Sequence, residues 1–184
     1  MKKNFLLILT AIFVLACGRA EKPGQTGMNS KTDVNNAAQS KEYINKGMEQ
    51  LSQQDIIGAL SSFDNAIRVD PQNPENYMVL GQVYLRLRNY DKAVDTFNAG
   101  TRIDPNYGEM YYFLAAANAV RYHLAENQQQ QSFYQSEGVL AAKRSVEIFV
   151  QEKDEEKFKR ALALLKSLEE GGDIGKTDEP ESIQ

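Results

Sequence analysis

The sequence predicts an all-α fold, a short solenoid of helix-turn-helix repeats closed by a C-terminal capping helix. Residues 43–73 align with residues 77–107 at a constant offset of 34 residues, and a third copy opens with Tyr111. Sequence similarity at such a period is typical of stacked helical units that share one continuous core. A last segment from about Asp154 carries one apolar face, which is what the exposed end of such a stack needs.

Composition restricts the possible partners. The 184 residues fit one domain of ordinary size with tails. The formal net charge is -4, and acidic residues are spread along the chain. Since a nucleic-acid surface requires clustered Lys and Arg, we expect no nucleic acid among the partners.

The first sixteen residues have the layout of a secretory signal. Lys2 and Lys3 precede an uncharged apolar run, "FLLILTAIFVLA", at positions 5–16. At about 1.5 Å per residue this run covers roughly 18 Å, less than the hydrocarbon core of about 30 Å. Residues 1–16 therefore predict a signal peptide rather than a spanning helix.

The stretch "VLAC", ending at Cys17, resembles the lipobox of bacterial lipoproteins. The resemblance implies cleavage before Cys17 and a thioether-linked diacylglycerol on that residue, with no other cofactor. The alternative is an ordinary secretory signal or an uncleaved anchor with an incidental cysteine. Two or three acyl chains hold a protein firmly at a bilayer. Because Gly18 follows the cysteine, the sorting rule of these lipoproteins favours the outer membrane where the organism has one.

The segments next to the repeats are poor in large apolar residues. Residues 17–39 contain three Gly, three Asn, one Pro and one Ser, with almost no large apolar residue, so we expect a lipidated cysteine followed by a flexible tether. Residues 173–184, after Gly171 and Gly172, are expected to form a disordered tail.

Between these tails we assign the domain 40–172. Repeat 1 covers 40–73, repeat 2 covers 74–107, and a degenerate repeat 3 covers 108–150, with the capping helix at 154–170. Asn73 is a suitable N-cap for a helix that begins at Pro74. The helices are expected at positions 41–53, 56–69, 75–88, 91–103 and 108–125.

Repeat 2 carries a specific set of large and small residues: Tyr77, Leu80, Gly81, Tyr84, Ala93, Phe97, Gly100 and Pro105. This pattern resembles the tetratricopeptide repeat. Repeat 1 has other residues where Leu and the second Tyr are expected, Lys46 and Gln50. It keeps the remaining positions of the pattern: Tyr43, Gly47, Ala59, Phe63, Ala66 and Pro71. Small residues let the two helices of a repeat approach while the Phe side chain fills the space between them, so a larger side chain there costs about 1–3 kcal/mol.

The repeat pattern breaks after His123. The run "AENQQQQS" is an insertion, and the sequence leaves open whether it is helix or loop. Helical spacing resumes at Val139. The capping helix has its apolar face at Phe158, Ala161, Leu162, Leu165 and Leu168.

The family resemblance also implies a binding face. Tetratricopeptide domains usually bind partners on a concave face lined by the first helix of each repeat. The corresponding residues here are Ile44, Met48, Leu51, Met78, Gln82, Leu85, Tyr112, Ala116 and Ala119. A largely apolar stripe that contains methionines suits an extended or helical peptide with hydrophobic anchors. Alternatively, a later helix or a second copy of the chain fills it.

Three better-known kinds of site are disfavoured: a carboxylate clamp, a phosphate-binding loop and a histidine-based centre. A subfamily clamps C-terminal carboxylates with Lys and Asn, but Ile44 and Met48 stand at those positions. The run "GGDIGKT" lacks the first glycine of a phosphate-binding loop, because Glu170 stands there. His123 is the only histidine, so neither a histidine-based triad nor a multi-histidine metal site can form. We expect no enzyme activity, no catalytic residue and no metal.

These features together predict a membrane-anchored scaffold of the bacterial cell envelope that binds other envelope proteins or peptides. One alternative is a self-associating structural lipoprotein, that is, a homo-oligomer. Another is an accessory subunit of a cell-wall enzyme or of a pilus or secretion assembly.

The anchor gives a first testable prediction. Replacing the thiol in Cys17→Ser should abolish metabolic labelling by palmitate and release or stall the protein, since no other cysteine can accept the lipid. Labelling of the variant and of the wild-type chain is compared in the same cells. Undiminished labelling of the variant would overturn the assignment of the anchor.

Overall fold

The computed structural model describes residues 30–171, and within this range the chain forms seven helices and no strand. The all-α prediction is therefore confirmed. The helices are α1 (Ser30–Ser52), α2 (Ile56–Val69), α3 (Pro74–Arg86), α4 (Tyr90–Ile103), α5 (Gly108–Leu124), α6 (Gln128–Glu152) and α7 (Glu155–Glu169). Among these residues no helix is both long and apolar enough to cross a membrane.

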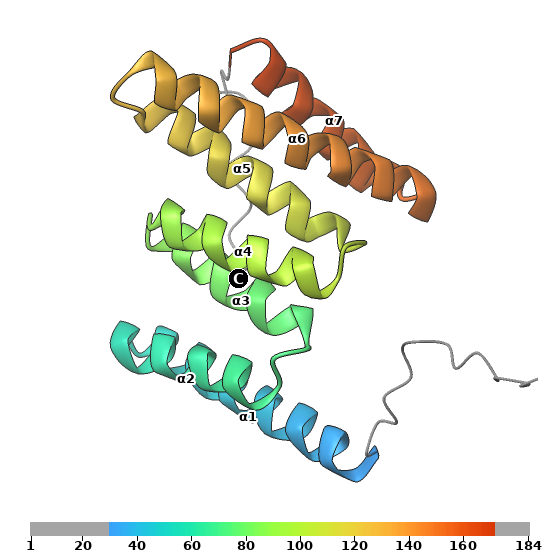
Figure 1. Cartoon of the computed structure of the whole chain (residues 1–184). Coiled ribbons are helices and arrows are strands. Elements are labelled where there is room, and N and C mark those ends of the chain that lie inside the picture. Colours follow the sequence, from blue (N-terminus) through green and yellow to red (C-terminus); the bar gives the residue numbers. More distant parts are fainter. Residues whose placement is uncertain (1–29, 172–184) are drawn as a thin grey trace, which may run out of the picture.

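The helices pair in chain order and stack as a solenoid. Helix α1 packs against α2, α3 against α4, and α5 against α6, and α7 closes the stack against α6 (Figure 1). Gln135 on α6 donates a hydrogen bond to the Leu168 carbonyl oxygen at 2.6 Å, which fixes the end of α7. Three of the seven helices begin after an Asn whose side chain accepts from the helix's own backbone, at Asn73, Asn89 and Asn127.

Helix α1 begins eleven residues earlier than expected. Positions 30–39 were assigned to a flexible tether, but they continue the helix of repeat 1. The lack of large apolar residues does not exclude a helix here. Extending an existing helix adds one hydrogen bond per residue without the cost of a new nucleus. The rest of the expected tether, Cys17 and the tail at 173–184 lie outside the described residues.

The glutamine-rich insertion is mostly helical. Helix α6 begins at Gln128, so only residues 125–127 connect it to α5. Asn127 accepts from the Gln130 backbone N–H at 2.9 Å, and the Gln130 side chain accepts from the Glu126 N–H at 3.0 Å. These two hydrogen bonds satisfy backbone N–H groups at the start of α6. The degenerate third repeat thus forms a long hairpin that extends to Glu152.

Close contact between glycine and phenylalanine sets the helix spacing in the first two repeats. A Cβ atom on Gly47 would lie 2.6 Å from Phe63 Cε1, and one on Gly81 would overlap the Phe97 ring. Both rings are completely buried, and so are Ala59 and Ala93 beside them. The ring of each second helix therefore lies directly on the backbone of the first helix.

A buried asparagine joins the first repeat to the second. Asn76 donates hydrogen bonds to the carbonyl oxygens of Ala66 at 3.2 Å and Asp70 at 2.9 Å. Its Oδ1 accepts from Ser40 Oγ at 2.8 Å. One side chain at the start of α3 thus binds both helices of the preceding repeat. It satisfies polar groups that would be costly to bury alone.

The glycine contacts predict a difference between two glycine-to-alanine variants. Gly81→Ala should lower the free energy of unfolding, because overpacking costs about 1–3 kcal/mol against a gain in helix propensity of about 1 kcal/mol. Gly138→Ala is the matched control. There the nearest atoms to the new Cβ would be the methyl groups of Leu168, at 3.1 and 3.3 Å, and Asn118 Cβ at 3.4 Å, which is looser than the contact at Gly81, so this variant should be neutral or more stable.

Urea denaturation of both variants gives the comparison directly. Equal stability of the two variants would show that the Phe97 ring does not set the helix spacing.

Candidate functional site

The residues expected on the binding face lie on α1, α3 and α5, but they differ in exposure. Met48 is 41% exposed, whereas Met78 is only 4% exposed and Ala119 is fully buried. The other positions are half-buried: Ile44, Leu51, Gln82, Leu85, Tyr112 and Ala116. Together these residues form a row across α1, α3 and α5, hereafter called the row. Its open part is centred on α1.

Met78 is not available to a partner, which corrects its assignment to the groove. It belongs to the buried cluster that also contains Phe97 and Met110. Helix α3 contacts α1, α2, α4 and α5. These neighbours enclose the Met78 side chain. At the equivalent position on α1, Ile44 is only half-buried.

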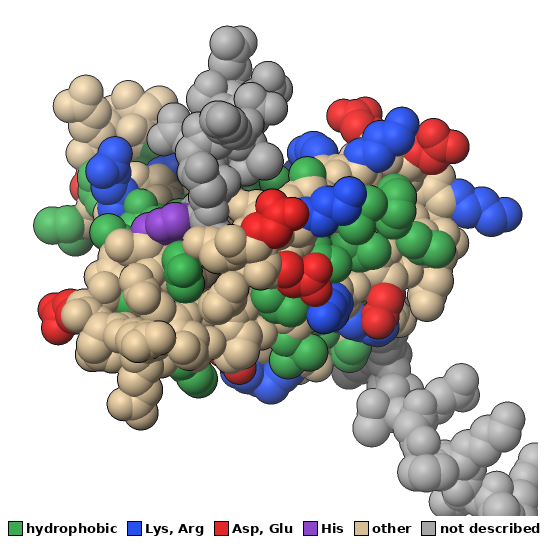
Figure 2. Space-filling view, turned by 90° about the horizontal axis from the view of Figure 1, so that it is seen from above, with side chains coloured by type: hydrophobic (Ala, Val, Ile, Leu, Met, Phe, Trp, Pro, Cys, Tyr) green, Lys and Arg blue, Asp and Glu red, His purple; other side chains and the backbone are tan. Residues whose placement is uncertain are grey.

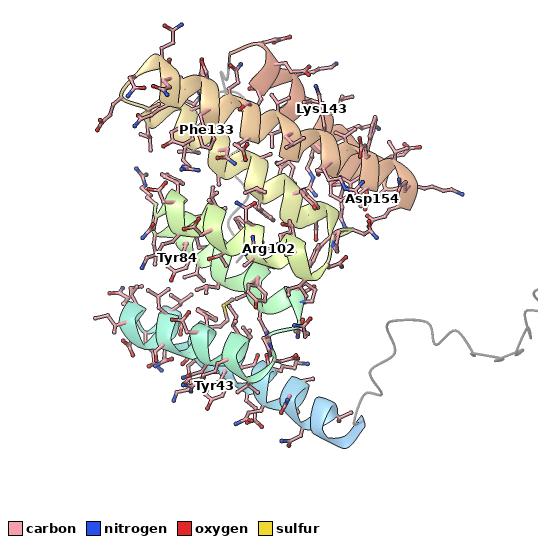
Figure 3. All side chains as sticks on the ribbon, in the orientation of Figure 1. Tyr43, Tyr84, Arg102, Phe133, Lys143 and Asp154 are labelled. Atoms are coloured by element: carbon pink, nitrogen blue, oxygen red, sulfur yellow. The ribbon has the colours of Figure 1, made fainter. Side chains whose placement is uncertain are left out.

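The last helix covers the end of the row on α5. The Arg160 guanidinium lies 5.7 Å from the centre of the Tyr112 ring. Lys157 Nζ lies 3.5 Å from Glu109 Oε1 and 3.5 Å from Asp154 Oδ2, at the start of α7 (Figure 3). Burial would lower the pKa of Lys157, but the charges of Glu109 and Asp154 raise it overall. These contacts leave the row open mainly along α1 and α3.

A tyrosine ties α3 to the turn before α5. The Tyr107 hydroxyl donates to Glu75 Oε1 at 2.6 Å. Burial raises the pKa of Tyr107, and the hydrogen bond and charge of Glu75 raise it further. The phenol therefore stays protonated and keeps donating at physiological pH. This contact orients the first turns of α3 and α5 relative to each other.

The other polar residues weighed in the sequence form no site with these. His123 is exposed and has its ring edge-on to Tyr122, with ring centres 5.2 Å apart. Asp154 is the N-cap of α7 and accepts from the Lys157 N–H at 3.0 Å. Between residues 30 and 171, no group of three or more His, Cys, Asp or Glu is placed to hold a metal ion.

Sequence reasoning missed a cleft of about 530 Å³ away from this row. It lies between the α3–α4 turn, the end of α5 and the start of α6. Its lining is Leu87, Arg88, Asn89, Tyr90, Asp91, Arg121, Leu124, Ala125, Glu126, Gln130 and Tyr134. The only signal in the sequence was the break in the repeat after His123, since the irregular third hairpin supplies one wall.

Comparisons with known proteins support the repeat assignment. Residues 50–117 match the tetratricopeptide repeat family. The human mitochondrial import receptor subunit TOM70 is 30% identical over 101 residues, which is 54% of this chain and 17% of that protein. The CTR9 homologue of Arabidopsis thaliana is 27% identical over 96 residues, 51% of this chain and 9% of that protein. The chain thus matches less than a fifth of either relative.

Solved structures show the same fold. The TPR2B domain of yeast Sti1, in complex with pHsp70, superposes with a TM-score of 0.60 at 14% identity, covering 72% of this chain and 98% of that one. The first TPR of Spaghetti (RPAP3), bound to an HSP90 peptide, gives a TM-score of 0.56 at 19% identity, covering 73% and 93%. The chain therefore carries a tetratricopeptide-type helical solenoid.

The burial of Met78 gives a prediction that separates folding from binding. Met78→Glu should lower the free energy of unfolding by about 3 kcal/mol or more, because it places an unpaired carboxylate in the core. Met48→Glu changes an exposed side chain of the same binding face, on α1. It should change the free energy of unfolding by less than about 0.5 kcal/mol. Urea denaturation followed by circular dichroism measures both, and equal losses would contradict the placement of Met78.

Proposed function

We propose that the protein is a lipid-anchored, non-catalytic interaction scaffold of the bacterial cell envelope. It binds a peptide or helix of a partner protein along α1 and α3. The observation that carries the proposal is the row of exposed and half-buried apolar side chains on these helices, with Met48 as its most open member. A methionine adapts its shape to different apolar partners.

The fold supports binding because it presents this row on a rigid frame. The buried rings of Phe63 and Phe97 hold each pair of helices at a fixed spacing. Asn76 fixes α3 relative to α1 and α2. A preorganised surface loses little entropy when a partner binds. Two superposable domains, from Sti1 and RPAP3, are described as bound to pHsp70 and to an HSP90 peptide, which supports a protein partner here.

The anchor part of the proposal rests on the sequence around Cys17. Thirteen residue steps separate Cys17 from the start of α1 at Ser30. A chain of that length spans at most about 45 Å. A lipid on Cys17 would thus keep the row on α1 close to the membrane surface, where other envelope proteins present their segments.

Self-association is the second candidate function. Leu162 stands on α7 where the tetratricopeptide repeats have Gly47 and Gly81, and it stays half-buried because no described helix follows α7. Val150 on α6 is exposed. Figure 2, which views this end of the stack, shows hydrophobic side chains among charged ones. Light scattering discriminates, because a monomer at high concentration excludes the self-associating scaffold.

A photocrosslinking experiment tests the leading function. A benzoylphenylalanine placed at Met48 in cells should give a discrete adduct with another envelope protein, since this side chain is open and central to the row. The matched control is Ile57 on α2, which is 85% exposed but lies outside the row. Adducts from Ile57 but not from Met48 would contradict the proposed face, and a Met48 adduct with a second copy would support self-association.

A further inference from the structure

We infer that the cleft between the α3–α4 turn, α5 and α6 is a second binding site, which takes a protein segment carrying a carboxylate side chain between large apolar residues. The cleft is separate from the row on α1 and α3, and the inference does not depend on that row. Its volume of about 530 Å³ is in the range that holds a small ligand or a few residues of a peptide.

The centre of the cleft is an immobilised arginine. The Arg121 guanidinium lies 4.1 Å from the centre of the Tyr134 ring, and its Nη1 donates to Asn118 Oδ1 at 3.0 Å. The side chain is only 18% exposed. An arginine held by stacking and a hydrogen bond loses little further freedom when it binds an anion.

The Nε–H group of this guanidinium makes no hydrogen bond within the described residues. Nε lies 3.0 Å from Asp91 Oδ1, but the N–H is not directed at that oxygen, so Nε is buried without a hydrogen bond. Nε and Nη2 form the edge that binds a carboxylate in two parallel hydrogen bonds. A buried donor without an acceptor is costly, and an incoming carboxylate would satisfy it.

Asp91 is a weak competitor for this edge. Its side chain is 79% exposed, and it reaches the guanidinium through one oxygen. Because water solvates the exposed Asp91 carboxylate well, its release from Arg121 costs little. A ligand carboxylate can therefore displace Asp91 and replace a poorly aligned contact with a bidentate one. Arg88 and Glu126 also line the cleft and carry opposite charges.

Apolar side chains at the rim define the rest of the ligand. Leu87 and Leu124 line the cleft and are exposed. Phe133, labelled in Figure 3, is 55% exposed on α6, and its ring lies edge-on to that of Tyr134, which lines the cleft. These are three of the eight large hydrophobic side chains that are exposed in the described part of the chain. The position of Leu87 and Leu124 in the same cleft as Arg121 favours a segment in which apolar residues flank the acid.

Peptide titration of the isotope-labelled full chain in detergent tests this inference. The probe is the acetylated, amidated peptide Ac-Leu-Glu-Leu-NH2. The Arg121 Nε–Hε signal and the backbone amides of Asn89, Asp91 and Ala125 should shift and saturate. The same peptide with Gln in place of Glu should bind about tenfold more weakly, because it loses the charge-assisted pair. Absence of saturable shifts, or equal binding of the Gln peptide, would overturn the inference.

Variants of the chain locate the site. Arg121→Lys keeps the charge but loses the planar edge, and should weaken binding about tenfold. Arg144→Lys is the control, since Arg144 bonds to Pro105 and Asn106 away from the cleft. Asp91→Asn should tighten binding, and weaker binding in this variant would contradict displacement of Asp91.

Two further arms separate this site from other possibilities. Met48→Glu should bind the Glu peptide as tightly as the wild-type chain does. The inference about the cleft therefore holds even if the row on α1 binds no partner. A peptide with Lys in place of Glu should not bind. Tighter binding of the Lys peptide would show that Asp91 and Glu126, rather than Arg121, select the ligand.

Discussion

The structure depends on the contact between a glycine on the first helix of a repeat and a buried phenylalanine ring on the second. Gly47 meets Phe63 and Gly81 meets Phe97, in both cases too closely for any Cβ atom. Interior packing at this density fixes the distance between two helices to within a few tenths of an ångström. The register of each hairpin follows, and with it the direction in which the side chains of α1 and α3 point.

The junctions between repeats use polar contacts to transmit this register along the stack. Asn76 joins α3 to the Ser40 hydroxyl on α1 and to the carbonyl oxygens at the end of α2. Tyr107 and Glu75 perform the same task between repeats 2 and 3. Directional bonds specify one relative orientation, whereas apolar contacts alone would tolerate several. The result is a frame in which a few exposed side chains keep fixed positions relative to one another.

Much of this architecture can be predicted from the sequence, because the offset of 34 residues and the small and aromatic positions are local patterns. What the sequence does not reveal depends on neighbours distant along the chain. Met78 has the spacing of a surface residue, yet other helices enclose it. The cleft at Arg121 needs Asp91, Asn118 and Tyr134, which come from three helices and share no motif. The early start of α1 follows from helix propagation, which burial patterns do not report.

Hydrogen–deuterium exchange of the full chain in membranes of the cells that produce it, compared with purified chain in detergent, tests the central claim most directly. The central claim is that a rigid stack presents α1 and α3 to a protein partner at the membrane. Stable binding should slow exchange at residues 44–51 and 78–86, and leave the second helices α2 and α4 unchanged. Slower exchange confined to α2 and α4, or no difference between the two samples, would contradict the account.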